Sequence, residues 1–146
     1  MPEIGRSDPE YWLKMLMGVG IIAHQLGEKL REEEELCDPD GSVHETKMRA
    51  YGLECDCNER NTRLIMSAPL SSKQRMIMKQ RYLKKKPWNG IVRYMSIEKR
   101  YAYRIHKHAL QGILRRNIGT DFEREYLTEK ARFDEINPYT REYENE

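Results

Sequence analysis

The sequence predicts an all-α protein with N-terminal amphipathic helices, a central helix-turn-helix unit and a C-terminal helical tail. Three observations lead there: apolar residues recur at helical spacing, no stretch alternates as a strand would, and positive charge is concentrated in one block. The 146 residues are 38% hydrophobic and 34% charged, which suits one domain with a modest core and much charged surface.

The first expected helix covers residues 8–36. Ser7 or Asp8 can cap it, Pro9 suits its first turn, and "EEEELCDPDG" ends it. The helix has an apolar stripe that packs either on the same chain or on a second copy, and both alternatives stay open. Gly18 and Gly20 either permit close approach of another helix or are tolerated flaws. The stripe consists of Trp12, Leu13, Leu16, Val19, Ala23, Leu26 and Leu30.

Further helices are expected along the rest of the chain. One covers residues 42–66, with an interruption around "YGLECDC", and Pro69 marks a boundary after it. Ser71 or Ser72 caps the next, which reaches residue 83, where "KKKP" breaks it. A short helix at 87–94 and a longer one at 98–117 follow. Thr120 or Asp121 caps a last helix in the tail, and residues 137–146 are expected to be loose.

The net charge of +2 conceals three regions of opposite sign. Residues 1–68 carry 8 Lys and Arg against 14 Asp and Glu, residues 69–118 carry 14 against 1, and residues 119–146 carry 4 against 9. We interpret them as an acidic helical region for association or partner binding, a basic DNA-binding domain, and an acidic helical or flexible tail. A block at +13 needs a polyanionic partner or close acidic neighbours, so the alternative is that the acidic flanks fold back and neutralise it.

Residues 88–107 fit the frame of a helix-turn-helix unit. Such a unit needs a compact residue where its helices touch, a tight turn at its ninth place, and apolar residues facing inward. Val92 takes the fifth place, and Ser96 stands in the turn, where Gly is usual. The inward positions are all apolar, and they are Ile91, Met95, Ile97, Ala102 and Ile105.

The opposite side of the second helix carries bases and no acid, which favours contact with DNA over simple solvation. Arg100 and Arg104 are expected near base edges, and the three lysines before the first helix near phosphates. A basic protein-binding surface is the alternative. His106 and Trp88 are expected to be structural. The candidate DNA-binding residues are Lys84, Lys85, Lys86, Arg93, Lys99, Arg100, Tyr103, Arg104, Lys107, His108 and Gln111.

The stretch "LSSKQRMIMKQRYLKKKPWNGIVRYMSIEKRYAYRIHKHALQGIL" resembles region four of bacterial sigma factors. The shared pattern is a Leu-x-x-x-Gln-Arg entry at Leu70, an Arg-Tyr pair at Arg81 and Tyr82, and a closing Ala-Leu at Ala109 and Leu110. The segment "YRIHKHAL" is similar to phage and prophage proteins of the ArpU-like type, regarded as late-gene transcriptional activators. The resemblance implies binding to a promoter element and contact with RNA polymerase. It covers about residues 69–115, and no counterpart of the promoter-melting sigma module is present.

The three cysteines suggest reduced thiols more than a metal site. Cys37, His44, Cys55 and Cys57 form a weak candidate zinc set, because their spacing lacks the usual pairs of structural zinc sites. No catalytic motif is found, so neither enzyme activity nor a cofactor is expected. No signal peptide is recognised, and the most apolar run, residues 11–26, is too short to span a membrane, so a cytoplasmic location in a bacterial host is expected.

The sequence therefore predicts a sequence-specific regulator of transcription that binds double-stranded DNA, acting with RNA polymerase as a phage late-gene activator. A small terminase subunit that recognises DNA during phage packaging is one alternative, and a polymerase-bound antiterminator is another. RNA polymerase and a second copy of the chain are the further partners that this interpretation allows.

Overall fold

The computed structural model describes residues 8–139, and this part of the chain is helical with no strand, which confirms the all-α prediction. In chain order the elements are α2 (Pro9–Leu36), α3 (Ser42–Ser67), α4 (Ser72–Met78), the π-helical turn η1 (Lys79–Leu83), α5 (Trp88–Met95), α6 (Lys99–Arg116) and α7 (Phe122–Ile136). None of these helices is both long and apolar enough to cross a membrane.

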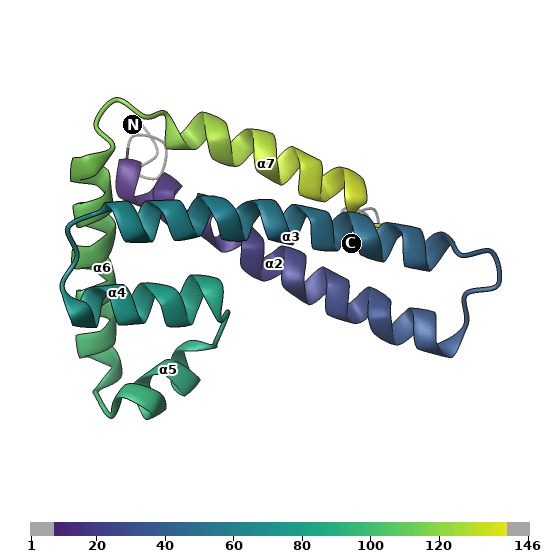
Figure 1. Cartoon of the computed structure of the whole chain (residues 1–146), viewed down its shortest axis with the longest axis horizontal. Coiled ribbons are helices and arrows are strands. Elements are labelled where there is room, and N and C mark those ends of the chain that lie inside the picture. Colours follow the sequence, from purple (N-terminus) through teal and green to yellow (C-terminus); the bar gives the residue numbers. More distant parts are fainter. Residues whose placement is uncertain (1–7, 140–146) are drawn as a thin grey trace, which may run out of the picture.

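The long helices α2 and α3 form an antiparallel hairpin, and α7 lies along it (Figure 1). Helix α6 crosses one end of the hairpin, with α4 and α5 beside it, so the short helices form a lobe at that end. The turn that joins α2 to α3 lies at the opposite end of the molecule.

Local capping explains most helix boundaries. Asp8 accepts a hydrogen bond from the Glu10 amide, and Pro9 occupies the first turn of α2. Ser71 and Gln74 form a reciprocal capping box at α4, and Asp121 caps α7 through the Arg124 amide. The caps expected at Asp8, Ser71 and Asp121 are therefore confirmed.

One prediction about helix continuity is wrong, and one helix differs in its geometry. Helix α3 runs without the expected interruption around residues 51–57, because Leu53 and Cys57 on its inner side are fully buried against α2 and α7. The helix that starts at Ser72 reaches Leu83, as expected, but its last turn is π-helical from Lys79, where the Lys84 amide donates to the Lys79 carbonyl at 2.9 Å.

The apolar stripe of α2 is covered by the same chain. Leu13, Leu16 and Met17 belong to a core cluster that also takes in residues of α3, α4, α6 and α7. Val19 and Leu30 belong to a second cluster, built from α2, α3 and α7. The stripe thus has an intramolecular partner, and the argument for association that depended on an unpaired stripe no longer applies.

The two glycines expected to permit close helix approach behave differently. A Cβ on Gly20 would lie 3.1 Å from the Cys57 Cβ, so α2 and α3 come close together there. A Cβ on Gly18 would meet no atom within 4 Å. Gly20 therefore supports the close-approach prediction, and Gly18 does not.

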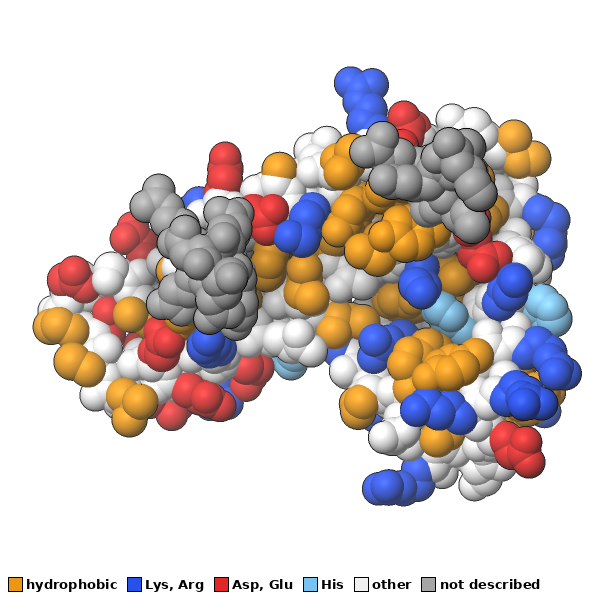
Figure 2. Space-filling model, turned by 180° about the vertical axis from the view of Figure 1, so that it is seen from behind, with side chains coloured by type: hydrophobic (Ala, Val, Ile, Leu, Met, Phe, Trp, Pro, Cys, Tyr) orange, Lys and Arg blue, Asp and Glu red, His pale blue; other side chains and the backbone are white. Residues whose placement is uncertain are grey.

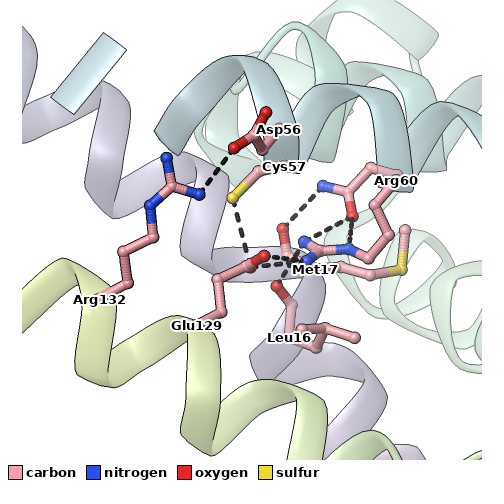
Figure 3. Close-up of polar contacts among 8 residues, drawn as sticks. Leu16, Met17, Asp56, Cys57, Arg60, Glu129 and Arg132 are labelled. Carbon is pink, nitrogen blue, oxygen red and sulfur yellow. Dashed lines mark hydrogen bonds and ion pairs between the residues drawn. The ribbon is translucent and has the colours of Figure 1, made fainter. Parts of the chain in front are cut away.

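Arg60 of α3 joins three helices in the interior (Figure 3). Its Nη1 donates to both carboxylate oxygens of Glu129 on α7, at 2.6 and 2.5 Å, and its Nη2 donates to the Leu16 carbonyl of α2 at 2.9 Å. Asn61 accepts from the same guanidinium and donates to the Met17 carbonyl at 3.0 Å. The network thus fixes α7 and α2 on α3.

Cys57 belongs to the same network. Its thiol donates to Glu129 at 3.3 Å, and burial, followed by the Glu129 charge, raises the pKa of the thiol to about 12. The sulfur is therefore a protonated hydrogen-bond donor at neutral pH.

The C-terminal residues were expected to be loose. Residues 140–146 lie outside the described part of the chain, but Tyr139 is held against α2, with the Lys29 ammonium 3.7 Å from the centre of its ring. The prediction is therefore wrong for Tyr139.

Replacing Glu129 by Ala should lower the free energy of unfolding by about 3 kcal/mol, because Arg60 would remain buried without its counter-charge. Urea denaturation measures the change. Glu135→Ala, which removes an exposed carboxylate from the same helix, should change it by less than about 0.5 kcal/mol. Equal effects of the two substitutions would show that the network does not stabilise the fold.

Candidate nucleic-acid interface

Helices α5 and α6 are joined by a tight three-residue turn. Its first residue, Ser96, is left-handed, with φ 54° and ψ 47°. Ser96 occupies the ninth place of the frame, where Gly is usual. The Ile97 amide donates to the Val92 carbonyl at 3.2 Å, which ends α5. The frame of short helix, turn and longer helix is thus present at the expected residues.

The inward side of this frame is apolar and packed. Ile91, Ala102 and Ile105 are buried together with Ile77 of α4, which the sequence pattern did not include. The remaining partners are only partly buried: Trp88, Val92, Met95 and Ile97. All five inward positions predicted from the sequence lie in this cluster.

The opposite side of α6 is exposed, and we name it the basic face. Its cations include Arg100, Arg104 and Lys107, and within residues 8–139 none of these three has a hydrogen-bond or ion-pair partner. Lys99 donates to Asn89 of α5 at 3.3 Å. The basic face consists of Lys99, Arg100, Tyr103, Arg104, Lys107 and His108.

Four further cations lie on α4, on α5 or just before α5. Arg93 on α5 and Lys84 are exposed and unpaired within the described residues. The Lys86 ammonium lies 4.6 Å from the ring centre of Tyr94, an exposed side chain. Lys73 of α4 similarly lies 5.4 Å from the ring centre of Tyr101. Lys84 and Arg93 are therefore exposed, whereas Lys86 is half-buried.

Lys85 was expected to face phosphates, and this prediction is wrong. Its side chain is only 6% exposed, and its ammonium lies 3.0 Å from the Glu54 carboxylate of α3. It also donates to Asn58 at 2.7 Å, and its backbone is left-handed, with φ 59°. Lys85 thus anchors the lobe to the hairpin, because residues about 30 positions earlier fold against it.

Gln111 is also placed differently. Its amide donates to Glu10 of α2 at 3.2 Å, and its side chain is half-buried. The helical spacing puts it on the outward side of α6, but α2 crosses that part of the helix. Gln111 therefore belongs to the contact between α6 and α2 and lies outside the basic face.

Asn89 and Tyr94 were missed by sequence reasoning. Asn89 accepts the hydrogen bond from Lys99. It could have been found from the sequence, because it lies one helical turn before Arg93 and therefore on the same side of α5. Tyr94 is 59% exposed beneath Lys86, and its spacing gave no signal.

His106 is structural, as expected. It is 7% exposed, its Nε2 shares a hydrogen bond with the Tyr82 hydroxyl at 2.7 Å, and Trp88 packs edge-on against its ring. Burial, followed by the charges of Lys14 and Arg81, lowers the pKa of His106 to about 4. The imidazole is therefore neutral at physiological pH.

The weak zinc set does not converge. Cys57 is buried beside Glu129, whereas Cys37 and Cys55 are exposed, and His44 pairs with Glu34 at 2.6 Å. Within residues 8–139 no three His, Cys, Asp or Glu side chains are grouped so that they could hold a metal ion.

Comparisons with known proteins give no match: no family model fits the chain, and no curated protein or solved structure is significantly similar to it. The resemblance to sigma region four thus depends on the residues quoted for it alone.

Lys85→Ala should lower the free energy of unfolding by about 3 kcal/mol, because the largely buried Glu54 carboxylate loses its lysine counter-charge and keeps only the hydrogen bond with His24. Lys85→Gly removes the same ion pair but accepts the left-handed backbone, so it should be less destabilising than Lys85→Ala by about 1 kcal/mol. Chemical denaturation distinguishes the two. A greater loss for the Gly variant would contradict this account.

The free energy of unfolding should fall as pH decreases from about 6.5 to 4. In that interval His106 takes up a proton in the unfolded state but not in the folded one. This difference lowers the free energy of unfolding by up to about 3 kcal/mol. His106→Gln should remove most of this slope, whereas His108→Gln, at an exposed position, should retain it. Urea titrations at successive pH values test this, and an unchanged slope in His106→Gln would refute it.

Proposed function

We propose that the protein binds double-stranded DNA sequence-specifically, with α6 in the major groove. The observation that carries the proposal is the absence of internal neutralisation. Within residues 8–139, Lys85 alone of the cations in residues 69–118 forms an ion pair. The acidic flanks therefore leave the exposed cations of the basic block, Arg100 and Arg104 among them, available to a polyanion.

The arrangement of the basic face supports this use. Arg100 and Arg104 lie in the first half of α6, the part of a recognition helix that reaches base edges. Arg93 on α5 and Lys84 before α5 are exposed, and in this proposal they contact backbone phosphates. A rigid apolar cluster behind α6 fixes the direction of these side chains.

The biological role that we propose is regulation of transcription together with RNA polymerase, as a phage late-gene activator. The support for this role is the sequence resemblance. A protein-binding role for the basic face is the competing proposal, and DNA binding distinguishes the two.

Arg104→Ala should weaken binding to a preferred duplex by about 1–3 kcal/mol and to random duplex much less, because a lost base contact lowers specificity. Lys84→Ala should weaken both duplexes about equally and flatten the salt slope by about one unit. Fluorescence anisotropy measures both, with a duplex selected from a random-sequence pool.

Arg132→Ala is the matched control, since Arg132 is an exposed arginine on α7 that pairs with Asp56. It should leave binding unchanged. For the unaltered protein, about four to six phosphate contacts predict a slope of log affinity against log salt of about −4 to −5. A slope near zero would remove the DNA proposal, and equal losses on both duplexes for Arg104→Ala would show that α6 does not read the bases.

A further inference from the structure

A groove of about 790 Å³ lies between the long-helix body and the lobe of short helices. Helices α2 and α7 line one side, and η1, α5 and α6 line the other. Figure 2 shows hydrophobic side chains gathered on both sides of this hollow, with Lys and Arg side chains at its edges. The volume falls within the roughly 300–1,000 Å³ typical of small-ligand sites.

The groove combines apolar walls with positive charge. Aromatic rings come from both sides, with Tyr126 on α7 facing the lobe that supplies Trp88 and Tyr103. Lys14 and Arg81 supply the charges, whereas Lys130, which also lines the groove, pairs with Asp134 at 2.6 Å. No Asp or Glu lines the groove among the described residues. An apolar body bearing an anionic group fits this chemistry.

Gly18 keeps the groove open. It lies in the middle of α2, where a glycine costs about 1 kcal/mol relative to Ala. No neighbouring helix requires it, because a Cβ built there meets no atom within 4 Å. A larger residue would project into the open space, so the missing side chain leaves room for a ligand.

His106 adds a polar group to the groove wall. Its Nε2 is engaged by Tyr82, whereas its Nδ1 has no hydrogen-bond partner among the described residues. When the Tyr82 hydroxyl donates to Nε2, Nδ1 carries the proton and is a donor for a ligand oxygen.

We propose that this groove binds a small amphipathic anion, with a flat apolar body between the aromatic rings and an anionic oxygen group near Lys14 and Arg81. Charge complementarity selects this ligand: two cations without an ion-pair partner among the described residues line an apolar space, and no carboxylate is among the lining residues. The proposal does not depend on DNA binding, and its test uses no DNA.

Two fluorescent probes test the site, the anion 8-anilinonaphthalene-1-sulfonate and its neutral analogue N-phenyl-1-naphthylamine. Both should bind the full-length protein saturably at one site per chain. Gly18→Leu fills the groove and should weaken both probes by about tenfold or more, whereas Gly18→Ala adds one methyl group and should change affinity less than about twofold. Circular dichroism should show both variants folded, since neither replacement meets a neighbouring atom at its Cβ.

The substitution Lys14→Gln tests the charge at the surface without altering the core, because Lys14 is exposed. It should weaken the sulfonate probe by about fivefold or more and the neutral probe by less than about twofold. Equal weakening of the two probes would overturn the assignment to an anion. Unchanged binding in Gly18→Leu would overturn the site itself. A protein that dimerises at rising concentration and then binds the probes more weakly would also overturn it, because a second copy would cover the groove.

Discussion

The arrangement of the long helices depends on placing one arginine in the interior. The guanidinium of Arg60 would be costly there alone, but Glu129 supplies the opposite charge and the Leu16 carbonyl accepts a further hydrogen bond. The Leu16 carbonyl comes within reach because Gly20 lets α2 approach α3 closely, one helical turn further along. Close packing, carbonyl access and charge pairing therefore require one another. Removing any one of the three would leave the buried guanidinium with a desolvation cost that the other two do not offset.

The same logic explains why the charge of the molecule remains segregated. Carboxylates on the hairpin and on α7 are engaged close to their own helices, as in the pairs of Lys47 with Glu34, Lys130 with Asp134 and Arg132 with Asp56. Glu54 contacts His24 of α2 and also reaches the lobe, where Lys85, just before α5, is its ion-pair partner among the described residues. The acidic residues thus stabilise the framework, while the cations of the basic face keep their full charge toward solvent.

Features set by neighbouring residues could be predicted from the sequence, and features set by distant residues could not. Caps at Asp8, Ser71 and Asp121 depend on bonds spanning two or three residues, and the inward positions of α5 and α6 follow from helical spacing. The roles of Lys85 and Gln111 were wrong because Glu54 and Glu10, which bind them, are remote in the sequence. The continuity of α3 was missed for a related reason, since tertiary burial of Leu53 and Cys57 outweighs the weak helix propensity around them. Periodicity identifies a face but not the helix that covers it.

The basic face depends on the long helices because α6 contributes to two cores. Its N-terminal half packs through Ala102 and Ile105 on α4 and α5, whereas its C-terminal half packs through Ala109, Leu110 and Ile113 into the cluster that contains the start of α2. Gly112 shows how close this second contact is, because a Cβ there would lie 2.9 Å from a methyl group of Leu70. A fragment limited to residues 69–118 would expose that half of α6 and lose the Lys85 anchor to Glu54. The direction in which Arg100 and Arg104 project is therefore a property of the whole helical framework, although both residues stand in the basic block.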